Sequence, residues 1–243
     1  MMNMAESNPP VTLIERVASQ LGAMIVRGEI PEGSMIPVED AASRQFGVGR
    51  NVLREAVKIL FGKGMLAPKR RHGTIVRNRE DWNALDPALL AWMLEDDTRR
   101  GGHLDAISEL RVIIEPEVAA LAARKATPEG VARLHAAWLA MERDANDALA
   151  AINSDIAFHK ILFSLAENHL VTSIMPAFEV ALRSNFRISI RRPGGFIRSL
   201  QEHRLVSEAV AANDPAGARA AMTVILMNNE RDLAQVIEAP PGA

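Results

Sequence analysis

The sequence predicts a mainly α-helical protein built from two unlike domains, and three observations support this prediction. Apolar residues recur at helical spacing over most of the 243 residues. Close to residue 65, two short β-prone runs flank a basic turn, which is typical of a β-hairpin. Residues 1–77 carry 11 basic and 7 acidic groups, whereas the remainder carries 17 and 23. We therefore expect an N-terminal winged helix-turn-helix with a small β-hairpin wing, followed by a C-terminal all-α antiparallel helical bundle.

The composition excludes several classes of protein. With 48% apolar residues, the chain is long enough to bury a core in each of two domains. Because it contains no cysteine, it has neither disulfides nor a thiolate metal site. The first residues lack the pattern of a signal peptide, and no uncharged apolar segment reaches the length of about 18 residues that a membrane-spanning helix needs. We expect a soluble, cytoplasmic protein with no membrane partner.

The first two helices are predicted from apolar spacing and from turn residues. Gly28, followed by the Pro-Glu-Gly turn at 31–33, ends the first helix, and Pro37 and Gly47 bound the second. The buried face of the first helix is expected to consist of Leu13, Val17, Leu21, Met24 and Ile25.

The third helix combines an apolar stripe with a basic row. It begins near Gly49 and Arg50, and its stripe has the i, i+3, i+4, i+7 spacing of a helix packed on a core. Arg50 and Asn51 lie at its N-terminus, where side chains of DNA-reading helices reach base edges. An ordinary amphipathic helix with a solvated basic face is the alternative. The stripe is Leu53, Ala56, Val57 and Leu60, and the row is Arg50, Arg54 and Lys58.

The predicted hairpin follows this helix at once. Residues 65–67 and 74–76 are its strands, and the turn between them is basic. Such a wing can place cations against phosphates or in the minor groove. The turn supplies Arg70, Arg71, His72 and Gly73.

Residues 11–77 resemble the DNA-binding domain of the GntR family of bacterial transcription regulators. The matching features are the turn at 31–33, Pro37, the segment GRNVLREAVKIL and the wing RHGTIV. Residues 38–40 depart from a Ser-Glu-Arg run that is frequent in the family, so Arg44 is the nearby candidate for a cationic contact. The residues expected to contact DNA are Arg44, Arg50, Asn51, Arg54, Arg70, Arg71, His72 and Gly73.

The expected domain boundaries follow the changes in pattern. Trp82 and Trp92 are expected to be packing anchors between the domains, and Asp86 with Pro87 is a helix start. Residues from 104 onward show breaks that divide them into about six helices. We expect a disordered N-terminus at 1–10, the winged helix-turn-helix at 11–77, a linker and connecting helix at 78–103, a helical effector-binding and dimerisation domain at 104–237, and a disordered tail at 238–243.

Three polar residues of the second domain form a candidate metal site. Asp155 and His159 stand at i, i+4 and project from one helical face, where they could chelate a divalent cation or simply be satisfied polar groups. The domain resembles the FadR-type (FCD) effector domain of the same family, whose metal-binding members use an Asp-x-x-x-His pair and two later histidines. That resemblance implies His203 as the third ligand and places Ile225 at the fourth position. We expect a divalent ion, Zn²⁺ by preference, held with lower affinity, and operation without metal stays open.

The resemblance runs from residue 11 to residue 237 and is strongest to regulators of sugar-acid catabolism. It implies a small-molecule sugar-acid effector, D-galactonate or a related aldonate. Arginine offers bidentate hydrogen bonds to a carboxylate, and Arg111 lies in a largely apolar helix where an unpaired charge would be costly. The expected effector-binding residues are Arg111, Arg183, Asn185 and Arg187.

These features predict a homodimeric, ligand-responsive repressor that binds a palindromic double-stranded DNA operator and leaves it when the effector binds. A helical metalloenzyme using Asp155, His159 and His203 is the alternative, but the chain lacks HExxH, GxSxG and a phosphate-binding glycine loop. A DNA-binding protein whose helical domain only dimerises is a third possibility. We expect no enzymatic activity.

Overall fold

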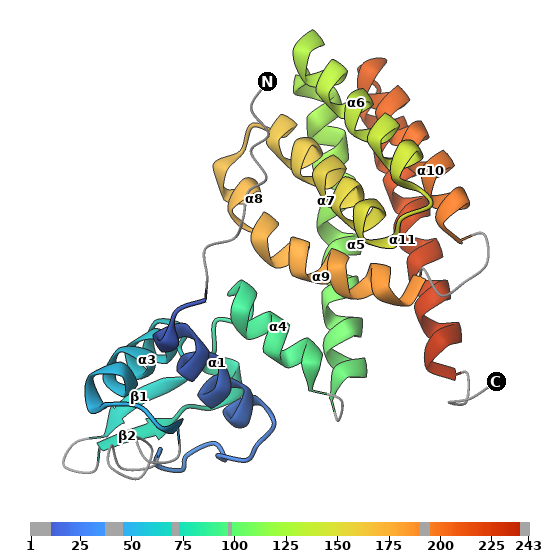
Figure 1. Ribbon diagram of the computed structural model, residues 1–243. Coiled ribbons are helices and arrows are strands. Elements are labelled where there is room, and N and C mark those ends of the chain that lie inside the picture. The colour runs from blue at the N-terminus through green and yellow to red at the C-terminus, as the bar shows by residue number, and fades with distance from the viewer. Residues whose placement is uncertain (1–10, 37–45, 70–72, 97–98, 190–194, 239–243) are drawn as a thin grey trace. The chain divides into compact units, whose positions relative to one another are not determined.

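The chain divides into two compact units, Met1–Thr98 and Arg99–Ala243. The structure is a computed structural model that describes residues 11–36, 46–69, 73–96, 99–189 and 195–238 (Figure 1). The first unit contains helices and a two-stranded sheet, and the described part of the second is helical. The predicted fold class is therefore confirmed.

Three helices surround the core of the first unit. α1 (Leu13–Val26) begins with a capping box in which Thr12 and Glu15 bind each other's backbone N–H groups. It ends before Gly28, whose φ of +78° favours glycine. α1 packs against α3 (Arg50–Gly62) and α4 (Pro87–Glu95). The predicted second helix falls mostly on residues 37–45, which lie outside the described residues.

The wing is an antiparallel hairpin of β1 (Leu66–Lys69) and β2 (Gly73–Val76). Leu66 stands opposite Val76, and both side chains are buried in the core of the unit. Residues 33–36 run along the other edge of β2, where Ile36 N–H donates to the Thr74 carbonyl at 3.1 Å. β2 is therefore hydrogen-bonded along both edges, to β1 on one side and to residues 33–36 on the other.

Trp82 and Trp92 pack within the first unit. Both belong to the core cluster that α1 and α3 form, and their indole N–H groups donate to the Arg77 carbonyl at 3.1 Å and to Ser19 Oγ at 3.0 Å, respectively. The Trp92 ring lies directly against Gly22, so that a Cβ atom there would overlap the ring. These described contacts of both rings lie inside the first unit, and the anchoring of one domain to the other stays a prediction.

The second unit is a bundle whose helices start where the sequence predicts breaks. Thr127, Asp147 and Asn168 cap three of them with side-chain oxygens. The five-residue α8 was not predicted, and it raises the number of described helices from the expected six to seven. The described helices are α5 (Arg100–Lys125), α6 (Pro128–Asp144), α7 (Ala148–Leu165), α8 (His169–Ser173), α9 (Met175–Ser189), α10 (Gly195–Ala211) and α11 (Pro215–Glu238).

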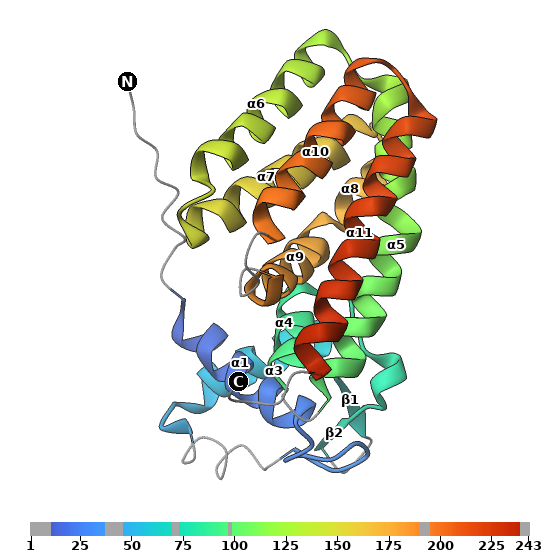
Figure 2. The same cartoon turned by 90° about the vertical axis from the view of Figure 1, so that its right-hand side faces the viewer.

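The long helices α5 and α11 lie side by side along the bundle (Figure 2). α7 contributes large side chains to the core of the bundle, because Phe158 and Phe163 are fully buried and the Phe158 ring lies 5.0 Å from the His203 ring of α10. α7 is also long and apolar enough to cross a membrane by length and composition alone. More than half of it is buried inside the bundle, as expected for the core helix of a globular domain.

Candidate functional site

Asp155, His159 and His203 meet in the centre of the bundle. One ligand atom from each lies within 4.8 Å of the others, and all three side chains are buried. His203 Nε2 is 3.2 Å from Asp155 Oδ1 and 3.3 Å from His159 Nε2. The structure therefore brings together the three residues that the sequence predicts as metal ligands.

Each imidazole ring has an acceptor oxygen beside its Nδ1 atom. The Nδ1 atom of His203 lies 2.7 Å from the Ser199 carbonyl oxygen, and that of His159 lies 3.0 Å from Glu115 Oε2. An acceptor next to Nδ1 favours a proton there and leaves the lone pair on Nε2. Two Nε2 lone pairs and a carboxylate then face one another, and this arrangement requires a cation between them, either a proton or a metal ion.

Glu115 connects this cluster to Arg111. Arg111 Nε donates to Glu115 Oε1 at 2.6 Å, and the two side chains are 2% and 0% exposed. Both residues belong to α5, one helical turn apart. Arg111 Nη2 has no hydrogen-bond partner among the residues that the structure describes. The bundle core thus contains a continuous charged network of Arg111, Glu115, His159, His203 and Asp155.

Burial and charge act in opposite directions on the pKa values of this network. Burial raises the pKa of Glu115, but Arg111 and His159 outweigh it and lower this pKa to about 2. For Asp155 burial also raises the pKa, and the neighbouring His203, His159 and Arg111 lower it overall. Burial lowers the pKa of His203, whereas Asp155, the Ser199 carbonyl and Glu202 raise it above its ordinary value. The charges of the network thus hold the pKa values of both carboxyl groups below, and the pKa of His203 above, their ordinary values.

The donor set fits a divalent cation. Two imidazole nitrogens and a carboxylate oxygen are ligands that Zn²⁺ and similar ions accept, with a fourth position left for water or a ligand oxygen. Ile225 is 1% exposed and packs in the apolar core of the bundle with Met222 and Val210, so it supplies no ligand atom. The buried cluster is compatible with a metal site of three protein ligands.

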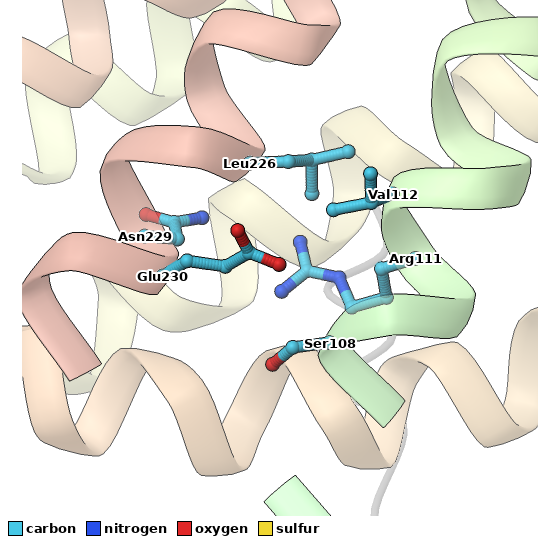
Figure 3. A pocket seen from close by; sticks show the side chains of 6 residues that line it. All are labelled: Ser108, Arg111, Val112, Leu226, Asn229 and Glu230. Carbon is cyan, nitrogen blue, oxygen red and sulfur yellow. The ribbon is translucent and has the colours of Figure 1, made fainter. Parts of the chain in front are cut away.

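A small pocket lies at Arg111, between α5 and α11. Its volume of about 10 Å³ holds the centre of one water molecule. Figure 3 shows the Glu230 carboxylate pointing from α11 toward the Arg111 guanidinium. The lining residues are Ser108, Arg111, Val112, Leu226, Asn229 and Glu230.

The other predicted effector-binding residues belong to α9. Arg183 is 41% exposed and donates to Asn153 Oδ1 at 3.0 Å and to Glu179 Oε1 at 2.9 Å. A ligand could use this guanidinium only if these hydrogen bonds rearrange. Asn185 and Arg187 lie within α9, but their side chains fall outside the described part of the structure.

The basic row of α3 is exposed on the first unit. Leu53, Ala56 and Leu60 are buried, so the stripe anchors the helix and turns the opposite face outward. The predicted base-reading residues Arg50 and Asn51 are exposed on its first turn. Arg54 is exposed as well, and Lys58 Nζ lies 2.7 Å from Glu55 Oε1.

The strands of the wing are described, and most of its basic turn is not. Gly73 has a φ of +94° and an exposed backbone, as the end of a tight turn requires. Arg44, Arg70, Arg71 and His72 lie outside the described residues. Lys69, at the end of β1, is exposed beside the turn.

Comparison with known proteins matches each unit to a protein family. Residues 13–76 match the bacterial regulatory proteins of the gntR family, and residues 106–228 match the FCD domain. The chain is 31% identical over 219 residues to the galactonate operon transcriptional repressor of Escherichia coli K12, which covers 89% of this chain and 95% of that protein. The chain belongs to the GntR family. It is a DNA-binding transcription regulator with an FCD domain, and not an enzyme.

Two further similarities agree with this assignment. A protein of E. coli K12 named as a regulator of the L-lactate dehydrogenase operon is 31% identical over 221 residues, which are 88% of this chain and 83% of that protein. The solved structure of Lar, titled as controlling the agr system of Listeria monocytogenes, has a TM-score of 0.66 at 19% identity and covers 94% of this chain and 99% of that one. The latter similarity shows the fold alone.

Sequence reasoning missed Glu115 as part of the site. The signal was present, because Glu115 follows Arg111 by four residues in an otherwise apolar stretch of α5. Such a pair lies on one face of a helix, and two charges on a buried face must compensate each other.

Replacing Glu115 with glutamine should destabilise the protein strongly. The variant would leave the Arg111 guanidinium buried without its anion, which costs about 3–5 kcal/mol of unfolding free energy. Urea unfolding would measure the loss. Glu117→Gln on the same helix is the control, because Glu117 pairs with Arg219 at the surface and should matter little. Equal losses in both variants would show that the buried pair has no special weight.

The stability of metal-free protein should fall as the pH rises above neutrality. Because the folded-state pKa of His203 is raised above 6.5, its contribution is fully present below that value and is lost as the pH passes the folded-state pKa. Urea unfolding with a chelator, at pH values from about 6 to 9, should show this slope, and His203→Asn should flatten it. Exposed His169→Asn is the control. A slope that survives in His203→Asn would assign it to another group.

Proposed function

We propose that the protein is a cytoplasmic homodimeric repressor that a sugar acid releases from a palindromic operator. One observation carries the proposal: a charged network is buried in the core of the helical unit, in a chain whose other unit is a DNA-binding module. A bundle that served only for dimerisation would be at least as stable with apolar residues at these positions. Such a network is useful where an anionic ligand has to be bound.

The DNA-reading role is assigned to α3 and the wing. Arg50 can bind guanine in bidentate fashion and Asn51 can bind adenine, both from the exposed first turn of the helix. Arg54 and Arg44 would contact the DNA backbone. The wing residues Arg70, Arg71, His72 and Gly73 would bind phosphates or enter the minor groove.

Charge balance supports a monoanionic effector. Arg111 and a proton on His203 would balance the charges of Glu115 and Asp155. A divalent ion, for which we propose Zn²⁺, would displace the His203 proton and leave one excess positive charge in a buried site. One carboxylate near Arg111 would neutralise that charge with bidentate hydrogen bonds.

The names of two relatives suggest which class of carboxylate the effector belongs to. Two proteins of equal identity, 31%, are named for operons of galactonate and of L-lactate dehydrogenase. Galactonate and lactate are both hydroxycarboxylates with a single negative charge. We therefore propose D-galactonate or a related aldonate as the effector, with Arg111 as its main contact and with Arg183, Asn185 and Arg187 as further contacts.

Release of the protein from the operator requires that the effector bind the released state more tightly than the DNA-binding state. A ligand shifts the equilibrium between DNA-binding and released states only by as much as it prefers one of them. Two reading heads in a dimer must match the spacing of two half-sites about 34 Å apart, so a modest change in dimer geometry suffices to weaken binding.

The test is binding to operator DNA with and without sugar acids. The fragment upstream of a neighbouring sugar-acid gene cluster should give a footprint, and D-galactonate or another aldonate should remove it. Hexoses without a carboxylate are the control and should leave the footprint unchanged. A footprint that no sugar acid affects would reject the effector, and the absence of any footprint at low salt would reject the operator.

Two arginine variants should distinguish a base-specific contact from non-specific electrostatic attraction to DNA. Arg50→Ala should cost roughly 1–3 kcal/mol on the operator and relax sequence preference, since a base contact is lost. Arg70→Ala should weaken operator and random DNA alike and reduce the salt dependence of binding. Titrations on both DNAs at several salt concentrations measure the difference. Equal losses of Arg50→Ala on the two DNAs would show that Arg50 does not read a base.

A further inference from the structure

The pocket at Arg111 has a charged floor and a charged rim. Its floor is the guanidinium of Arg111, a residue that is 1% exposed. The Nη2 atom of this group has no hydrogen-bond partner among the described residues. Its rim is Glu230, which is exposed on α11. Figure 3 shows that the carboxylate of Glu230 points into the pocket, toward Arg111.

Arg111 can accept a second anion in this direction. Its Nε donates to Glu115 at 2.6 Å, Nη2 has no hydrogen-bond partner among the described residues, and the residue lines the pocket. An unmet buried donor is unfavourable, so an acceptor that enters the pocket gains a full hydrogen bond. The space of about 10 Å³ admits one small polar group, such as a carboxylate oxygen, and leaves the rest of a ligand at the rim.

Glu230 is in position to meet that remaining part. It forms no hydrogen bond or ion pair with the residues that the structure describes, unlike the surface glutamates Glu117 and Glu179, which are tied to arginine or lysine. A carboxylate accepts hydrogen bonds and cannot donate them when charged. It therefore attracts a hydroxyl group and repels another carboxylate.

We propose that Glu230 is a specificity-determining residue of the effector site, selecting hydroxycarboxylates over plain carboxylates. The ligand carboxylate binds Nη2 of Arg111, and a hydroxyl near it donates to Glu230. A carboxylate without hydroxyls meets the same Arg111 but only repulsion from Glu230. This inference rests on the proposed function, because it assumes an anionic effector at Arg111.

The other pocket residues do not make this distinction. Leu226 and Val112 form an apolar wall, and Ser108 and Asn229 are neutral groups that can both donate and accept. Neutral groups bind a hydroxyl and a carboxylate alike. Among the described lining residues, Glu230 is the acceptor whose charge separates the two ligand classes.

The experiment compares two six-carbon monoanions, D-galactonate and hexanoate, by isothermal titration calorimetry on the 243-residue chain. The native protein should bind D-galactonate more tightly. In Glu230→Ala the ratio of the two affinities should fall by at least about tenfold, since one charge-assisted hydrogen bond is lost and one repulsion is removed. Glu142→Ala is the control, because Glu142 is an exposed glutamate on α6 and should keep the native ratio.

The outcomes are distinct. A reduced ratio in Glu230→Ala with an unchanged ratio in Glu142→Ala supports the inference. An unchanged ratio in Glu230→Ala overturns it and leaves the proposed function intact. If neither anion binds native or variant protein, the inference is also overturned, and the operator footprint with a wider set of sugar acids decides separately whether the chain is an effector-responsive repressor.

Discussion

The buried pair of Arg111 and Glu115 is the interaction on which the centre of the helical unit depends. Two charges removed from water are costly, and their mutual attraction offsets the cost only when the remaining hydrogen-bonding groups are also met. Glu115 lies between two such groups, 2.6 Å from Arg111 Nε and 3.0 Å from His159 Nδ1. Arg111 does not meet this condition fully, because Nη2 lacks a partner among the described residues. The open end of the network is therefore at Arg111, on the side of α11.

The same network links several helices. α5 supplies Arg111 and Glu115, α7 supplies Asp155 and His159, and α10 supplies His203. A change of charge at one end, whether by a proton, a metal ion or a carboxylate, alters the energy of contacts on all three. This is a physical basis for transmission, because interfaces in a packed core shift between discrete arrangements rather than deforming continuously. Whether a ligand uses it depends on its differential contacts in the two states.

Local patterns explain what the sequence could predict. The apolar stripe of α3, the caps of the bundle helices and the shared face of Asp155 and His159 all depend on residues a few positions apart. The meeting of His203 with this pair was predicted only through family resemblance, since His159 and His203 are 44 residues apart in the chain. Glu230 was missed because its role depends on which helix packs on α5, whereas the i, i+4 spacing of Arg111 and Glu115 was a local signal that could have been used. The sequence predicted that Trp82 and Trp92 pack as anchors, but it could not show that both rings contribute to the core of the first unit.

Ile225 gives the site a property that a fourth histidine would remove. With three protein ligands, a bound divalent ion keeps one position for water or for a ligand oxygen. An effector oxygen in that position would strengthen the binding of the ion, and by thermodynamic linkage the ion would raise the affinity for the effector by the same factor. Because Ile225 is packed at 1% exposure among apolar side chains, no small movement of α11 can supply a replacement ligand from that position. A site with three protein ligands would therefore couple metal affinity to effector affinity, which a site closed by a fourth histidine would not do.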